Sequence, residues 1–113
     1  MTDHPALAAS AAAHIRDLAE ATKDAHEAYG SPADIASVTE SLRDLARHLE
    51  KALDHLARHI DRRDGWDTTD GEQPRRYSRE ASGQIRSANA DAHNMVRALG
   101  RSVEALVHLK SAP

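Results

Sequence analysis

The sequence predicts an all-α protein of three helices, and three observations point to this class. Apolar residues recur in alternating steps of three and four, which is the spacing of one helix face. Start and stop signals divide the chain into three segments, and one stretch before the third lacks this periodicity. The 113 residues are therefore predicted to form a single domain, 1–113, with helices at about 4–29, 32–63 and 74–110 and a loop at about 64–73.

The central segment carries the clearest helix signals. Ser31 is suited to cap the helix start, Pro32 is tolerated at the first position, and Asp34 lies near the positive helix end. Arg62, Arg63 and the following Asp-Gly pair mark the end. Between these signals the apolar residues form a heptad seam wide enough for a bundle. The seam residues are Ile35, Val38, Leu42, Leu45, Leu49, Ala52 and Leu56, widened by Leu53 and Ile60.

The flanking segments are predicted to pack along this helix in an antiparallel, up-down arrangement. The first helix begins after Asp3 and stops at Gly30, and alanine dominates its seam, which favours close approach to the central helix. The third helix begins near Pro74, and its second half is aliphatic. Its apolar side contains Ala81, Ile85, Ala88, Ala92, Met95, Leu99, Val103, Leu106 and Leu109.

The apolar content of one chain is small for a core. The sequence has no phenylalanine and no cysteine, and its net charge of −3 is too low to favour disorder. A thin periodic stripe is typically completed by a second copy, so we expect a homodimeric helical bundle with coiled-coil-like packing. The expected core and dimer seam consists of Leu42, Leu45, Leu49, Leu56, Leu99 and Leu106.

An eleven-residue echo occurs within the central helix: Leu-Ala-Arg-His-Leu at 45–49 returns as Leu-Ala-Arg-His-Ile at 56–60. Eleven residues close three helical turns, so the two copies face the same way. His48, His55 and His59 consequently lie together beside the leucines. We interpret this histidine flank as the margin of a bundle interface. The alternative is a zinc or other divalent metal site whose third ligand comes from another helix or subunit, such as His14 or His93.

Arginines and aromatic residues gather around the predicted loop. We interpret this Arg/Trp patch first as a salt-bridge network, because interleaved acids nearly cancel its charge. The alternatives are a docking site for an unidentified protein and a nucleotide or nucleic-acid surface. The patch consists of Arg62, Arg63, Trp66, Arg75, Arg76 and Tyr77.

The function indicated by these patterns is non-catalytic. The sequence contains no cysteine nucleophile, no Gly-x-Ser-x-Gly motif and no glycine-rich phosphate loop. We expect a small interaction or assembly protein, an adaptor or regulator, without a cofactor and without a membrane partner, in a bacterial cytoplasm. The alternative is a ligand-binding regulatory module that uses the histidine flank or the Arg/Trp patch.

The charges are unevenly distributed along the sequence. Acids outnumber bases ten to five in residues 1–57, and bases outnumber acids ten to eight in residues 58–113. This difference is suited to orienting helices or subunits against each other.

Overall fold

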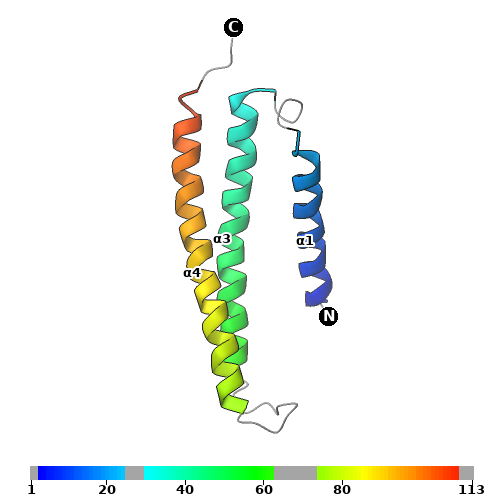
Figure 1. Cartoon of the computed structure of the whole chain (residues 1–113), viewed down its shortest axis with the longest axis vertical. Helices are drawn as coiled ribbons and strands as arrows, with labels where there is room; N and C mark the ends of the chain where they lie inside the picture. The colour runs from blue at the N-terminus through cyan, green and yellow to red at the C-terminus, as the bar shows by residue number, and fades with distance from the viewer. Residues whose placement is uncertain (1–2, 25–29, 63–73, 110–113) are drawn as a thin grey trace.

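The computed structural model describes residues 3–24, 30–62 and 74–109, and these residues form helices without a strand among them (Figure 1). The helices are α1 (His4–Ala21), α3 (Pro32–Arg62) and α4 (Pro74–Leu106). The prediction of an all-α helical bundle is confirmed. None of the described helices has the length and apolar character required to cross a membrane.

The starts of α1 and α3 agree with the capping signals. The Asp3 carboxylate accepts a hydrogen bond from the Ala6 N–H at 3.1 Å, and the Ser31 hydroxyl oxygen accepts one from the Asp34 N–H at 3.3 Å. Each cap satisfies a backbone donor that has no partner within its helix. The residue that begins α3, Pro32, needs no donor there.

Two helix ends come earlier than predicted. α1 ends at Ala21 instead of about residue 29, because Thr22 satisfies the last carbonyls: its N–H and its hydroxyl both donate to the Leu18 carbonyl, at 3.1 and 2.7 Å. Residues 25–29 lie outside the described residues. α4 ends at Leu106 instead of about residue 110. The Val107 N–H still bonds four residues back, to Val103, but the N–H groups of His108 and Leu109 bond three residues back and form a turn.

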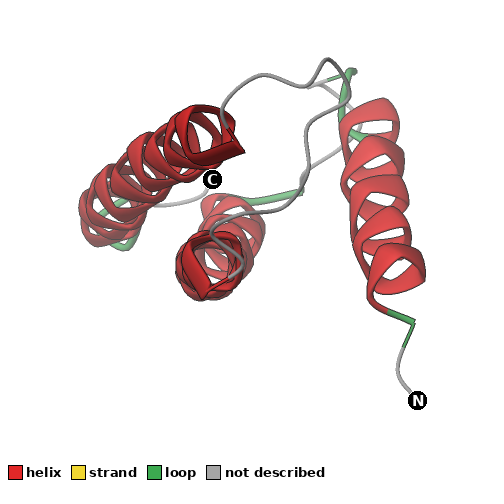
Figure 2. Ribbon diagram, turned by 90° about the horizontal axis from the view of Figure 1, so that it is seen from below, coloured by secondary structure: helices red, strands yellow, loops and turns green. Residues whose placement is uncertain are grey.

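α3 and α4 form a long hairpin. Going along α4, Arg86 lies beside Asp61, Asn89 beside Glu50, and Gly100 against Arg43, so α4 returns along α3. Of the described helices, these two are the pair in extensive contact. α1 lies beside α3 on the side away from α4 and buries no residue (Figures 1 and 2). The close packing that its alanine-rich seam predicted is therefore not found, because so few large side chains offer little area to bury.

Small residues form the contact between α3 and α4. Ala46, Ala57, Ala92 and Ser82 are buried, and no large side chain among the described residues is fully buried. Ala46 and Ala57 are eleven residues apart, so they differ by only about 20° around the helix. Where Gly100 lacks a side chain, the Arg43 guanidinium approaches to 3.1 Å of the position a Cβ would take. Small residues thus let the two helices approach closely.

Three residues of the predicted leucine seam lie beside this contact and not within it. Leu45, Leu49 and Leu56 are exposed. The physical reason is angular: Leu49 and Leu56 lie about 60° and 80° around α3 from Ala46, on one side of the line of contact. The other predicted seam residues are half-buried, namely Leu42, Leu99 and Leu106.

Candidate functional site

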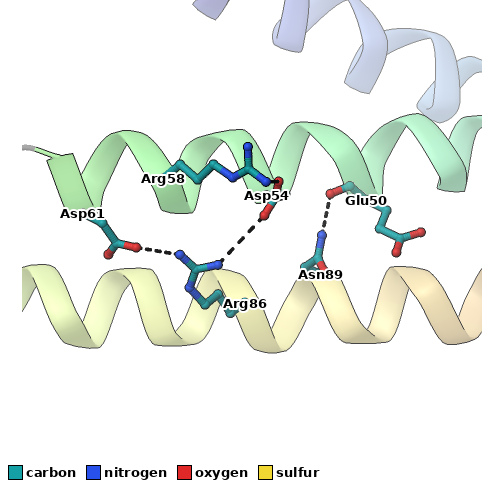
Figure 3. Close-up of polar contacts among 6 residues, drawn as sticks. All are labelled: Glu50, Asp54, Arg58, Asp61, Arg86 and Asn89. Atoms are coloured by element: carbon teal, nitrogen blue, oxygen red, sulfur yellow. Dashed lines mark hydrogen bonds and ion pairs between the residues drawn. The ribbon is translucent and has the colours of Figure 1, made fainter.

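The hairpin has one polar face and one apolar face. Glu50 and Asp54 of α3 lie about 40° and 80° from Ala46 on the side opposite the leucines. They meet Asn89 and Arg86 of α4 there (Figure 3). On α4, Met95 lies about 60° from Ala92, on the side opposite Asn89. The apolar side chains of both helices therefore gather on the face of the hairpin turned away from these polar contacts.

We call this surface the apolar face and define it by its large exposed side chains. Their exposed fractions are 38% for Leu45, 41% for Leu49, 51% for Leu56, 48% for Met95 and 41% for Tyr77. Single exposed apolar residues are normal on a protein surface, but here several lie on one face of two adjacent helices, which makes this face a candidate interaction site. The apolar face is the candidate functional site of the described part of the chain.

The chain as a whole exposes more surface than a compact fold of its mass. The accessible surface is 8983 Å², whereas a compact monomer of 12.3 kDa exposes about 6,100 Å². The radius of gyration is 18.9 Å against about 13 Å for a compact chain of this length. The excess of roughly 2,900 Å² is surface that a compact fold of the same mass would remove from water.

Ion pairs and an amide tie the helices together on the polar face. Arg86 pairs with Asp61 and lies 3.9 Å from Asp54, which also pairs with Arg58 at 3.0 Å (Figure 3). The Asn89 amide donates a hydrogen bond to the backbone carbonyl of Glu50. These groups are partly exposed, so each ion pair adds little stability, but together they fix which residues of α3 and α4 lie side by side.

Asp61 has the one resolved pKa shift among the described titratable groups. A hydrogen bond from the Ser82 hydroxyl is the largest cause, followed by a hydrogen bond from Arg86, and both lower the pKa of Asp61 from its usual 3.8. Each stabilises the charged carboxylate. Ser82 is only 4% exposed, so its hydroxyl is held beside Asp61 within the contact between the helices.

A pH titration tests this arrangement. Replacing Ser82 with alanine is expected to raise the pKa of Asp61 toward 3.8, because the largest stabilising contact of the carboxylate is lost. A lowered pKa means that the folded state binds the proton less well. The stabilisation is therefore complete above the pKa of the unfolded chain and is lost as the pH falls through the folded pKa. NMR titration of the Asp61 carboxyl carbon measures the change.

The control for this titration is Ser87→Ala, at an exposed serine of the same helix, which is expected to leave the Asp61 titration unchanged. An Asp61 titration that is identical in the Ser82→Ala variant and the unaltered chain would contradict the assignment.

The rest of the polar face holds paired charges. Nδ1 of His93 lies 3.1 Å from the Glu50 carboxylate. A solvent-open hollow nearby is lined by Arg47, Glu50, Lys51, Asp54 and Asn89. Positive and negative side chains alternate around this hollow, so it shows no net preference for an anion or a cation.

The histidine flank does not assemble a metal site within the described residues. His48, His55 and His59 are exposed on α3, and His48 lies 3.8 Å from Asp44. Among residues 3–24, 30–62 and 74–109, no three His, Cys, Asp or Glu side chains gather closely enough to hold a metal ion. His93, named as a possible third ligand, is beside Glu50 on α4.

The Arg/Trp patch is only partly placed. Trp66 and Arg63 lie outside the described residues, as does the side chain of Arg75. Arg62 is exposed at the end of α3. At the start of α4 the Arg76 guanidinium lies 5.8 Å from the centroid of the Tyr77 ring, a cation–π distance. The end of α3 and the start of α4 lie at the same end of the hairpin, so these three residues share that end (Figure 1).

Comparison with known proteins found no match among protein-family models, curated proteins or solved structures. The site rests on the geometry of the chain itself. Sequence reasoning named the leucines of the apolar face but missed the alanine contact that leaves them exposed. The eleven-residue echo contained the signal, since its alanines, Ala46 and Ala57, are the two buried residues of α3.

Proposed function

We propose that the chain is a small, non-catalytic interaction protein that acts as a homodimeric antiparallel bundle, in which the apolar faces of two α3–α4 hairpins meet. The observation that carries this proposal is the half-exposed apolar face, formed by both helices together. Large aliphatic side chains in water gain free energy when a second surface covers them, at about 25 cal/mol per Å². An identical hairpin offers a face of the same size and apolar character.

The area supports a dimer of the obligate kind. Such an interface removes about 1,000–2,500 Å² of surface from each subunit. The chain exposes roughly 2,900 Å² more than a compact monomer of its mass, an excess that includes both the apolar face and α1, which buries no residue. The packing is coiled-coil-like, with Leu45, Leu49 and Leu56 of one copy between side chains of the other.

The adaptor role is part of the same proposal. The polar face, with its paired ions, stays in water when the apolar faces meet, which leaves the exposed helix surfaces and the segment containing Trp66 for an unidentified protein partner. A bacterial cytoplasm is the proposed location.

Native mass spectrometry combined with sedimentation equilibrium of the full chain tests the proposal. We expect a species of twice the 12.3 kDa chain mass, without added mass from a ligand. We also expect the thermal midpoint to rise with protein concentration, because association stabilises the folded state by mass action. A single 12.3 kDa species with a midpoint independent of concentration would overturn the dimer.

A further inference from the structure

We infer that the second copy binds in one orientation, with its α4 against α3 of the first copy, and that this orientation is selected by two histidines on α3 and two acids on α4. The inference rests on the proposed dimer. Its starting point is that the apolar face has two long edges, one along α3 and one along α4, and that these edges carry different side chains.

The edge along α3 is the histidine flank. His48 and His59 lie about 60° and 40° around α3 from Leu45, on the side away from α4. Both are exposed, because α1 buries no residue and does not cover them. They are eleven residues apart in the sequence, which is about 16 Å along the helix.

The edge along α4 carries two carboxylates, and we call it the acidic edge. Asp91 and Glu80 lie about 40° and 60° around α4 from Met95, on the side away from α3. Both are exposed, and they too are eleven residues apart. The histidine flank and the acidic edge therefore carry side chains of complementary chemistry with the same spacing.

The hairpin places these two pairs of residues at matching heights. The Asn89 amide bonds to the backbone carbonyl of Glu50, so these two residues lie side by side. Because α4 runs antiparallel to α3, Asp91 and His48, each two residues from this bond in the same direction, are at about the same height. The second acid and the second histidine are level in the same way, because both are eleven residues farther along. Within one chain, the whole apolar face separates the acids from the histidines.

A two-fold axis parallel to the hairpin brings the two edges together. Such an axis preserves every height and places α3 of each copy against α4 of the other. His48 then faces Asp91 of the second copy, His59 faces Glu80 of the second copy, and each contact occurs twice. An imidazole N–H donates well to a carboxylate, and a protonated ring adds an attraction between opposite charges.

The other way to join two identical faces turns the second hairpin end over end. α3 then lies on α3 and α4 on α4, so that the acidic edge meets the acidic edge and the histidine flank meets the histidine flank. Carboxylates placed against carboxylates disfavour this arrangement. The residues on the two edges thus select the orientation in which α3 lies against α4.

Cysteine cross-linking reports the orientation, because the sequence contains no cysteine. Ala52→Cys lies on the α3 edge and Ser87→Cys on the α4 edge, both at exposed positions of about equal height that leave the histidines and acids in place. The two full-length variants, one with an added mass tag, are mixed, unfolded, refolded and treated with a short bis-maleimide. We expect a product that joins one chain of each kind, and at least roughly tenfold less product that joins two Ala52→Cys chains.

Charge reversal tests the contacts themselves by sedimentation equilibrium. His59→Glu is expected to weaken dimerisation about tenfold, because two carboxylates then face each other across the interface. Adding Glu80→Lys to the same chain is expected to restore association to within about threefold, because the opposite charges meet again. The matched control is His55→Glu, at a height where α4 has Gln84 and no acid, and we expect it to dimerise as the unaltered chain does.

The outcomes separate this inference from the proposed dimer. Mixed cross-linked product, together with rescue by Glu80→Lys, supports the orientation. A dimer in which Ala52→Cys links mainly to itself, in which His59→Glu associates as tightly as His55→Glu, or in which Glu80→Lys gives no rescue overturns the inference and leaves the dimer intact. A monomer in sedimentation overturns both.

Discussion

Leu49→Asp is expected to weaken dimerisation by roughly a hundredfold or more while the α3–α4 hairpin remains helical. Leu49 is 41% exposed in the single chain, so an aspartate there reaches water and costs the monomer little. In the proposed dimer the same side chain is covered by the second copy, where an unpaired carboxylate is unfavourable. A symmetric dimer contains the substitution twice, which enlarges the effect.

Sedimentation equilibrium measures the change in association, and far-UV circular dichroism reports the helix content. The matched control is His55→Asp, which adds the same negative charge to α3 at an exposed position on the histidine flank. We expect this control to dimerise as the unaltered chain does. If Leu49→Asp and His55→Asp associate equally well, the apolar face is not the dimer contact.

Ala57→Leu is expected to destabilise the folded chain by about 1–3 kcal/mol, because added carbons have no room at a fully buried position. Ala57 is 0% exposed and is one of the two buried residues of α3. The larger side chain must force the helices apart, which also strains the contacts of Asp61 and Asp54 with Arg86. Urea unfolding, at a concentration where the unaltered chain and the variant share one oligomeric state, measures the loss.

Ala90→Leu provides the comparison for this substitution, since Ala90 is exposed on α4 about 160° around the helix from the buried Ala92. Leucine and alanine have similar helix propensities, so we expect a change within about 0.5 kcal/mol there. Equal stability of the Ala57→Leu variant and the unaltered chain would show that the contact between α3 and α4 has room for a leucine side chain at this position.

The helix class and the helix starts were predictable because their causes are local. The Asp3 and Ser31 caps act on backbone groups only three residues away. The early end of α1 was also local, but it depended on the carbonyl to which the Thr22 hydroxyl donates its hydrogen bond. Threonine is compatible with continuing a helix and with ending one, so its identity did not decide between the two.

The line of contact between α3 and α4 was not predictable from α3 by itself. The leucine seam is the most hydrophobic line of that helix, yet the partner helix lies over Ala46 and Ala57. What selects the alanines is a property of two helices together: the small Ala92 and the polar ties from Asn89 and Arg86 lie opposite them. A single-helix pattern cannot contain the position of those partners.

The described residues include the whole histidine flank but only part of the Arg/Trp patch. His48, His55 and His59 are exposed to water. Among the described residues, they do not form a group of three side chains that could hold a metal ion, either together or with a neighbouring acid. For the Arg/Trp patch, Arg76 and Tyr77 lie together, while Trp66 lies outside the described residues. The patch stays a prediction, and its binding partner belongs to the proposal made above.

The division of the hairpin into one polar and one apolar face has a consequence for how far assembly can proceed. A pair of identical subunits that join through the same surface on each forms a closed, two-fold object. In the proposed dimer the hairpin surfaces directed outward are those with the ion pairs of Arg86, Asp54 and Arg58, which are polar and do not repeat the apolar face. Under this proposal, growth through the apolar face stops at two chains, and the hairpins do not stack through it into open-ended filaments.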